Sequence, residues 1–398
     1  MTSTSSSPSG LTADVWRLCF VQTLFFTAVN VNIINTSLVG THLAPAPWMA
    51  TLPLSFQFLA AMFTSLPASL AMGRFGRRPV FITGVLISIL STTIQAVAIF
   101  QASFVLFMAA SVSLGLAQGI AQFYRYAAAD SVAADVKPRA ISMVLLGGLG
   151  AAFLGPEISI RTAAYFPEAP YAGCYIAVAL VQLINLIVLS RLQIGAPRRE
   201  VYKGRRFAEF GRHPLFVAGL VAAALGYALM SFVMTATPLQ IVTVSQLGDA
   251  SNARIIQWHV IAMFAPSFVT GHIIRKIGYA PTILAGIILF AFSIGVGLSG
   301  DNYTVYFSAL ILLGVGWNLL FVSGSSLIAL VARPQERARI QGIADFLITF
   351  CVALASFSAG YIHSVAGWAL LLYIGVIPLA LICLMMIMVG RKLPPASS

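Results

Sequence analysis

The sequence predicts an all-α polytopic membrane protein with twelve transmembrane helices in two six-helix, pseudo-symmetric halves. The chain of 398 residues is 59% hydrophobic and only 9% charged, with a mean hydropathy of +0.93, whereas a soluble domain is about one quarter charged. Apolar stretches of about 20 residues, each able to cross the hydrocarbon core of a bilayer, recur from Leu18 to Val389. Two sequence patterns also recur in both halves of the chain at nearly the same offset.

Each apolar stretch is bounded by a short polar break and is long enough for one helix. The first six predicted helices occupy residues 15–39, 48–72, 79–99, 104–129, 139–165 and 171–191. The second six occupy residues 214–243, 253–275, 281–299, 304–331, 339–363 and 367–390. An even number of spans places both termini on the same side of the membrane.

The longest polar stretch between spans, from Gln193 to Pro214, divides the chain into its two predicted halves. The predicted segments are a disordered cytoplasmic tail at 1–13, an N-terminal half at 14–192, a basic cytoplasmic linker at 193–213, a C-terminal half at 214–390 and a cytoplasmic tail at 391–398.

An internal repeat supports the two halves. Ser69–Gly76, after the second span, aligns with Gly271–Gly278, after the eighth, at a shift of 202 residues. Lys137–Ala140 aligns with Glu336–Ala338 at a shift of 198 residues. Fixed-offset similarity is the signature of a structural repeat. With six spans each, both halves enter the membrane in the same direction and are related by an axis along its normal.

The basic residues predict the orientation. Lys and Arg outnumber Asp and Glu 23 to 11. All of the basic residues except Arg125, Arg161 and Arg254 fall in alternate loops or near the termini. This asymmetry places both termini in the cytoplasm, in a multi-pass protein of the inner (plasma) membrane. Because the charges form no continuous basic face, nucleic acid is not an expected partner in spite of the net charge of +12.

After the second span the chain reads Gly73-Arg74-Phe75-Gly76-Arg77-Arg78. This segment resembles the hallmark of the major facilitator superfamily, G-x-L-a-D-r-x-G-R-R. A glycine suits a tight turn, and the arginines suit a cytoplasmic interface with anionic lipids. Gly73 stands where the family has its aspartate, Ser69 where it has a glycine, and Arg275 holds the equivalent position in the second half. The family's charge lock between domains therefore lacks its usual acid.

Two further segments resemble parts of this family. In the fifth span, Gly147–Gly150 followed by Gly155-Pro156 is similar to the glycine-proline motif of proton-coupled antiporters, although Ser159 and Ile160 replace its second glycine pair. Tyr124, Arg125 and the alanines that follow resemble a bacterial subgroup that includes riboflavin uptake proteins. The direction of transport stays open.

The resemblance implies a secondary active transporter that moves a small polar or aromatic organic solute by alternating access, with proton coupling. The alternatives are a riboflavin-type vitamin uptake facilitator, a drug or metabolite proton antiporter, and a non-transporting membrane receptor. The sequence contains no nucleophile, metalloprotease or nucleotide-binding signature, so we expect no enzyme activity, catalytic residue, metal or cofactor. The expected partners are the solute, the lipid bilayer and protons, and the chain is expected to be monomeric.

The fourth span carries a candidate polar face. Gln118, Gln122 and Arg125 recur at i, i+4 and i+7, which places them on one side of a continuous helix. Ionisable residues within a bilayer are costly, so this face is a candidate for solute binding. The alternative is that Arg125 extends to the inner interface as a snorkelling residue.

Other buried charges are candidates for proton coupling or gating. Glu157 and Arg161 are spaced i, i+4 and can form a local ion pair, or Glu157 can take up a proton. Arg254, His259 and Asp345 complete this set. One hypothesis pairs Arg125 with Asp345 at an inner gate and Glu157 with Arg254 at an outer gate; the alternative is that each charge is satisfied within its own half.

In proteins that resemble this family, spans 1, 4, 7 and 10 line the central cavity. The resemblance therefore adds substrate candidates from those spans: Asn30, Asn32, Thr235, Thr237, Gln240, Trp317 and Asn318. Amide side chains bind neutral polar groups, and Trp317 can stack on a ring. The alternative for the Asn and Thr residues is hydrogen bonding between neighbouring helices.

Overall fold

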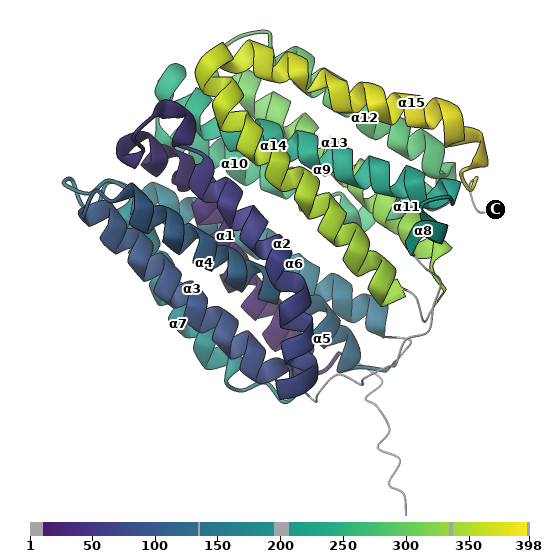
Figure 1. Ribbon diagram of the computed structural model, residues 1–398, viewed down its shortest axis with the longest axis horizontal. Helices are drawn as coiled ribbons and strands as arrows, with labels where there is room; N and C mark the ends of the chain where they lie inside the picture. The colour runs from purple at the N-terminus through teal and green to yellow at the C-terminus, as the bar shows by residue number, and fades with distance from the viewer. Residues whose placement is uncertain (1–10, 134–135, 195–206, 334–336, 396–398) are drawn as a thin grey trace, which may run out of the picture. The chain divides into compact units, whose positions relative to one another are not determined.

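A computed structural model of the chain describes residues 11–133, 136–194, 207–333 and 337–395 (Figure 1). Nearly all of these residues are helical, and none of them lies in a strand. Most of the predicted basic linker and nearly all of the first tail lie outside the described residues.

The helices of the first half of the chain are α1 (Ala13–Leu43), η1 (Pro47–Met49), α2 (Leu52–Phe75), α3 (Arg77–Phe100), α4 (Phe104–Ala121), α5 (Tyr124–Asp130), α6 (Lys137–Thr162) and α7 (Ala172–Leu189). Those of the second half are α8 (Phe207–Phe210), α9 (Pro214–Pro238), η2 (Leu239–Val244), α10 (Asp249–Phe264), α11 (Ser267–Ile277), α12 (Tyr279–Gly297), α13 (Tyr303–Val331), α14 (Arg337–Ile374), α15 (Val376–Val389) and η3 (Gly390–Lys392).

The twelve-span layout is confirmed. Among the described residues, ten helical segments are long and apolar enough to cross a membrane. The pair α10 and α11, bent by 42°, adds one broken span. The segment Ile340–Lys392 counts as one of the ten, but Gly367 within it has φ 75° and ψ −177°, so two spans meet there. That conformation is essentially restricted to glycine, which explains how the chain reverses without a loop.

Three spans are less regular than the sequence suggests. Gln122 and Phe123 form a turn that separates α4 from α5, where Phe123 N–H donates to the Ile120 carbonyl three residues back. The end of the seventh span is a π-helix, η2, directly after Pro238. The eighth span begins at Asp249 rather than 253 and breaks before Ser267. Pro238 and Pro266 each lie directly before the later segment, and the backbone donor that a proline lacks accounts for both breaks.

The turn after the second span has the same backbone as the turn after the eighth. Gly76 has φ 86° and ψ 165°, and Gly278 has φ 85° and ψ 173°. Side chains with a Cβ avoid this region, so both turns require glycine. The shift of 202 residues that relates the two sequences therefore also relates their local structures.

By their packing, the residues fall into two units. The first contains Met1–Asn35 and Leu59–Arg199, and the second contains Thr36–Phe58 and Glu200–Ser398. The segment Thr36–Phe58, which runs from the end of α1 to the start of α2, thus packs within the second unit. Ser55 Oγ lies 3.0 Å from Ser356 Oγ there, and Thr235 Oγ1 donates to Ser356 Oγ over 3.1 Å.

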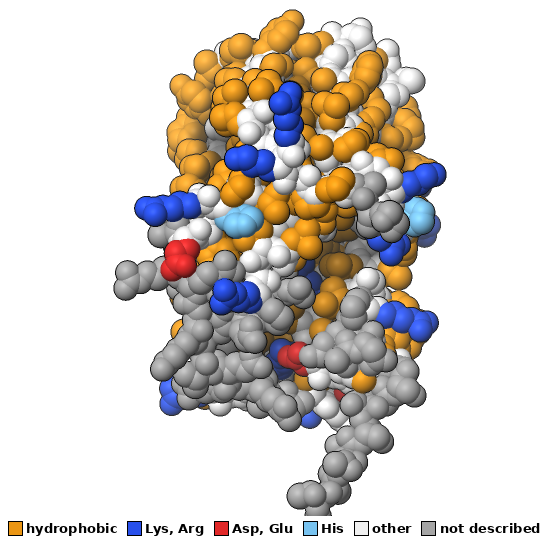
Figure 2. Space-filling view, turned by 90° about the vertical axis from the view of Figure 1, so that its right-hand side faces the viewer, with side chains coloured by type: hydrophobic (Ala, Val, Ile, Leu, Met, Phe, Trp, Pro, Cys, Tyr) orange, Lys and Arg blue, Asp and Glu red, His pale blue; other side chains and the backbone are white. Residues whose placement is uncertain are grey.

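The outer surface carries many large apolar side chains, including Leu66, Val105 and Ile387, which are 70%, 71% and 79% exposed. In Figure 2, apolar side chains cover much of the visible face and basic side chains clearly outnumber acidic ones on it. An apolar exterior is what lipid solvates, and exposed helices with internally satisfied backbones suit that environment.

Candidate solute-binding residues

The two asparagines of α1 differ in their contacts. Asn32 is fully buried, donates to the Ala28 carbonyl and accepts a 2.9 Å hydrogen bond from Gln95 Nε2, which also donates to Ser111 Oγ. It therefore joins α1, α3 and α4 and acts in helix packing. Asn30 is also buried, but its Nδ2 has no hydrogen-bond partner among the described residues. Asn30 is the better candidate for a solute contact.

The predicted polar face of the fourth span is divided between two helices. Gln118 lies in α4, Gln122 in the turn, and Arg125 in α5, and all three are half-buried. Arg125 Nη2 donates to the Tyr126 hydroxyl over 3.1 Å, and its guanidinium carbon lies 4.8 Å from the centre of the Tyr126 ring. The turn means that the i, i+4, i+7 spacing does not describe one continuous helix face. Tyr126, which the sequence analysis did not select, orients the arginine.

Glu157 and Arg161 form the local ion pair that their i, i+4 spacing allows, with Nε and Oε2 separated by 3.2 Å. The Arg161 side chain is 77% exposed and that of Glu157 is 32% exposed. An exposed pair of this kind contributes at most about 1 kcal/mol to stability. In the second unit, Arg254 Nη1 donates to Gln257 Oε1 over 2.9 Å.

The motif after the second span has an acid that the sequence analysis missed. Arg77, whose side chain is 9% exposed, forms an ion pair with Asp130 at the end of α5. Arg77 Nη1 has no hydrogen-bond partner among the described residues, and a Cβ added at Gly73 would meet no atom within 4 Å. The space that the family's aspartate fills is thus open here. The signal for Asp130 was an acid at the end of an apolar span.

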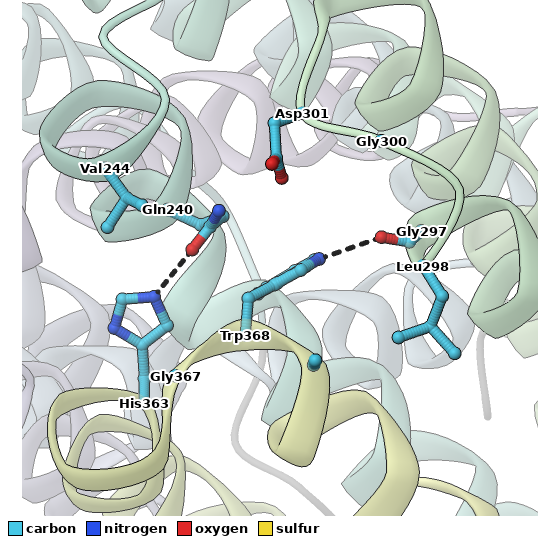
Figure 3. Close-up of a pocket in the computed structure, with 10 residues that line it drawn as sticks. Gln240, Val244, Gly297, Leu298, Gly300, Asp301, His363, Gly367 and Trp368 are labelled. Carbon is cyan, nitrogen blue, oxygen red and sulfur yellow. Dashed lines mark hydrogen bonds between the residues drawn. The ribbon is translucent and has the colours of Figure 1, made fainter.

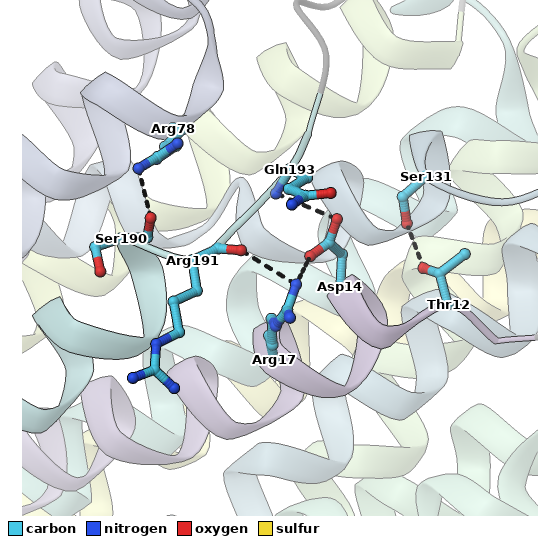
Figure 4. A network of polar contacts seen from close by, with 8 residues as sticks. All are labelled: Thr12, Asp14, Arg17, Arg78, Ser131, Ser190, Arg191 and Gln193. Atoms are coloured by element: carbon cyan, nitrogen blue, oxygen red, sulfur yellow. Dashed lines mark hydrogen bonds and ion pairs between the residues drawn. The ribbon is translucent and has the colours of Figure 1, made fainter.

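Arg78, a second arginine of the motif, contacts the end of α7, which is also bonded to the start of α1 (Figure 4). Arg78 Nη2 donates to the Ser190 carbonyl, and Arg17 donates both to Asp14 and to the Arg191 carbonyl. Gln193 N–H donates to the second oxygen of Asp14. Arg74 lies over the Phe75 ring, 5.2 Å from its centre. These contacts give the motif arginines a structural role within the first unit.

The glycine-proline segment of α6 packs closely on α1. A Cβ on Gly147 would lie 2.6 Å from the Cys19 carbonyl oxygen, and one on Gly150 would lie 2.7 Å from Thr23 Cγ2. A Cβ on Gly155 would lie 2.7 Å from Asn30 Cβ. Small residues let transmembrane helices approach closely. In this structure the segment therefore sets the contact between α1 and α6.

Several predicted residues of the second unit are committed to helix packing. Thr237 Oγ1 donates to the Val233 carbonyl of its own helix. Asn318 Nδ2 donates to the Met263 carbonyl and to Ser267 Oγ, and its Oδ1 accepts from Thr270 over 2.6 Å. His259 Nδ1 lies 2.7 Å from the Leu310 carbonyl and donates to it, because a carbonyl only accepts. His259 thus links α10 to α13 through Nδ1, whereas its Nε2 has no hydrogen-bond partner among the described residues.

Trp317 stands at the centre of an aromatic cluster in the second unit. It stacks on Phe321 with ring centres 4.9 Å apart and planes 10° apart, and it meets Tyr227 and Phe264 edge to face at 5.2 and 6.0 Å. Trp317 is 5% exposed, whereas the other three rings are partly exposed. Asp345 lies close enough to Tyr227 to interact with it electrostatically.

The Trp317 indole Nε1 has no hydrogen-bond partner among the described residues. A buried donor without a partner costs about 1–3 kcal/mol. We therefore regard the aromatic cluster, defined as Tyr227, Phe264, Trp317 and Phe321, as the part of the second unit best suited to hold a planar ring. The sequence analysis selected Trp317 but not its three neighbours, which come from α9, α10 and α13.

Gln240 lies apart from these packing contacts. It belongs to the π-helix η2 and lines a cavity together with Asp301, His363 and Trp368 (Figure 3). No group of three or more His, Cys, Asp or Glu side chains that could hold a metal ion occurs in the described part of the chain.

Comparison with known proteins places this architecture in a family. A sequence model of the Major Facilitator Superfamily matches residues 18–251 and 242–398. Riboflavin transporter RfnT of Brucella anthropi is 38% identical over 355 residues, which are 88% of this chain and 89% of the relative. The uncharacterized MFS-type transporter YddS of Bacillus subtilis is 25% identical over 89% of this chain and 85% of its own length.

Solved structures share the fold at low sequence identity. A D-xylose-proton symporter has a TM-score of 0.74 at 12% identity and covers 94% of this chain and 97% of its own. The nucleoside transporter NupG has a TM-score of 0.71 at 13% identity, over 94% of this chain and 99% of its own. These helices, repeats and relatives agree on a multi-pass membrane protein, and the chain belongs to the Major Facilitator Superfamily.

Proposed function

We propose that this protein is a secondary active transporter for planar, polar heteroaromatic solutes of the riboflavin type. The observation that carries the proposal is the aromatic cluster around Trp317, with its unpartnered indole N–H. The 38% identity to a riboflavin transporter supports the same solute class. A flavin combines a flat ring, ring nitrogen and carbonyl acceptors, and a chain of hydroxyl groups.

The geometry of the cluster suits such a ring. Tyr227, Phe264 and Phe321 present partly exposed faces and edges, on which an aromatic solute stacks for about 0.5–1.5 kcal/mol per ring beyond its buried area. The Trp317 N–H supplies a donor to a ring nitrogen or carbonyl. In the first unit, Asn30, Gln118 and Gln122 remain candidates for solute contacts, with Asn30 Nδ2 as a donor without a partner among the described residues.

The transport cycle in this proposal is alternating access driven by a proton gradient, with both termini in the cytoplasm and a monomer as the working unit. Pairing of Arg125 with Asp345 is kept as the proposed inner closure. For Glu157 and Arg254, the contacts within each unit, to Arg161 and Gln257, favour the alternative in which each charge is satisfied locally. Glu157 then serves as the candidate proton-binding group.

Uptake of radiolabelled riboflavin into proteoliposomes, with and without an inward proton gradient, tests the function. We expect saturable uptake that unlabelled riboflavin blocks and that a proton gradient increases. Trp317→Leu should lower the affinity at least about tenfold, because both stacking and the indole donor are lost. Trp258→Leu is the matched control, since Trp258 is 47% exposed on α10 and lies outside the cluster.

The outcomes separate the competing functions. Riboflavin binding without uptake in either direction would favour a non-transporting receptor. Efflux of preloaded solute that is driven by an inward proton gradient would favour an antiporter that exports its solute. Absence of both binding and transport, by well-folded protein, would reject the riboflavin-type solute.

A further inference from the structure

The second unit contains a cavity of about 350 Å³ whose lining includes none of the aromatic cluster (Figure 3). Its volume is near the lower end of the range for small-molecule sites, about 300–1,000 Å³. Three parts of the unit form its wall: the π-helix η2, the turn between α12 and α13, and α14 on both sides of the Gly367 break. The lining residues that the argument uses are Gln240, Leu298, Asp301, His363 and Trp368.

A chain of hydrogen bonds fixes the polar wall. His363 Nε2 donates to Gln240 Oε1 over 3.1 Å, and the Gln240 amide donates to the Tyr306 hydroxyl over 2.9 Å and to Ser245 Oγ over 3.4 Å. Tyr306 donates to Asp301 Oδ1 over 3.0 Å. Because a tyrosine has a single hydroxyl proton, Ser245 must donate in its 2.7 Å contact with Tyr306.

The side-chain N–H donors of this wall already donate to protein acceptors. Trp368 Nε1 donates to the Gly297 carbonyl over 3.1 Å, and the amide of Gln240 and the Nε2 proton of His363 are already bound. The groups left over are Asp301 Oδ2 and His363 Nδ1, for which the described residues provide no hydrogen-bond donor. In an imidazole whose Nε2 carries the proton, Nδ1 is an acceptor. In Figure 3, however, His363 Nδ1 points away from Asp301, so the acceptor that the cavity offers to an occupant is Asp301 Oδ2.

Charge and shape narrow the occupant further. The lining contains one carboxylate, that of Asp301, and no Lys or Arg. Its apolar side consists of Val244, Leu298, Ala369 and the Trp368 indole. A cation with N–H groups can donate to the Asp301 carboxylate and neutralise its charge. An apolar group attached to that cation fits the Trp368 indole, which also attracts cations through its π face.

We propose that this cavity binds small organic ammonium ions, with the ammonium group at Asp301 Oδ2 and its apolar substituent against Trp368. The site is separate from the proposed solute site at Trp317 and does not depend on it. An occupant contacts η2, the α12–α13 turn and α14 at the same time. Because it binds the folded protein, it stabilises the folded state against unfolding.

Thermal unfolding of the purified full-length protein in detergent, titrated with benzylammonium chloride, tests the site. Benzyl alcohol is the neutral control of the same shape, and it also corrects for partition into the micelle. We expect a saturable rise in the midpoint temperature with benzylammonium and a smaller, non-saturating change with benzyl alcohol. Asp301→Asn keeps the acceptor for Tyr306 but removes the charge, and it should weaken binding about tenfold or more.

Matched variants distinguish this site from general charge effects and from the proposed function. Asp249→Asn removes another carboxylate of the same unit that does not line the cavity, and it should leave benzylammonium binding unchanged. Trp317→Leu should also bind benzylammonium as the unmodified protein does, whether or not the protein transports riboflavin. Equal stabilisation by benzylammonium and benzyl alcohol, or unchanged binding in Asp301→Asn, would overturn the proposal. The first of these comparisons needs no variant, so it decides even if Asp301→Asn does not fold.

Discussion

The helix pair α1 and α6 in the first unit and the pair α9 and α14 in the second solve the same packing problem in opposite ways. In the first pair the small residues lie on α6, where Gly147 and Gly150 approach the backbone and side chains of α1. At the shift of 198 residues the counterparts of these glycines are Asp345 and Ile348. Ile348 is buried against Ala223 and Ala224, so in the second pair the small residues lie on α9.

This difference shows that the repeat preserves the contact and not the residues that make it. Either helix of a crossing pair can supply the small side chains, provided that its partner supplies the large ones. The exchange also releases position 345 from close packing, and the second unit places a charge there.

The largest expected effect comes from filling a glycine contact in one unit only. Gly147→Leu would force a Cβ to within 2.6 Å of the Cys19 carbonyl, and overpacking against backbone should cost about 3 kcal/mol or more. Gly342→Leu, in α14, is the control, because a Cβ there meets nothing within 4 Å. Thermal unfolding in detergent should show a large loss for the first variant and little change for the second. Equal losses would remove the distinction between the two pairs.

The next effect tests the ion pair that the second unit lacks. The counterpart of Arg77, at the shift of 202 residues, is Tyr279. Asp130→Ala leaves the buried Arg77 without its carboxylate and should destabilise the protein by about 1–3 kcal/mol. Asp130→Ala combined with Arg77→Ala should recover part of that loss, which a double-mutant cycle by chemical or thermal unfolding measures. Simple additivity would mean that the pair contributes nothing.

A smaller gain is expected from restoring the acid that the motif lacks. Gly73→Asp places a carboxylate in open space four residues before Arg77, whose Nη1 has no partner among the described residues. The unfavourable position of an acid at a helix C-terminus offsets part of the gain, so we expect about 0.5 kcal/mol. A gain that persists in an Arg77→Ala background would contradict the pairing.

The smallest effect on stability should come from the exposed pair in α6. Its counterparts at the shift of 198 residues are Ala355 and Ala359, so the second unit has no equivalent. Arg161→Ala and Glu157→Gln should each change the free energy of unfolding by less than about 0.5 kcal/mol. If Glu157 binds the coupled proton, Glu157→Gln should keep solute binding and lose the response of uptake to a pH gradient. An intact response would leave Glu157 with only its structural contact to Arg161.

The candidate site was only partly predictable. Sequence position and polarity selected Trp317 and Asn30, which keep unsatisfied donors. They also selected Asn32 and Asn318, which are bonded to neighbouring helices, and Thr237, which is bonded to its own helix. Hydropathy cannot separate these two groups. A buried amide has the same residue type whether its partner is a helix or a solute.

The sequence by itself determined the twelve spans, their division and the two equivalent glycine turns, because a bilayer requires helices of a minimum apolar length and one backbone conformation excludes every residue with a Cβ. Tertiary structure alone decided that Asp130 pairs with Arg77 and that Asp301 and His363 meet in one cavity. These partners are 53 and 62 residues apart in the chain. Such contacts depend on how helices cross and where they break, which follows from packing among many side chains and not from the local pattern of any one helix.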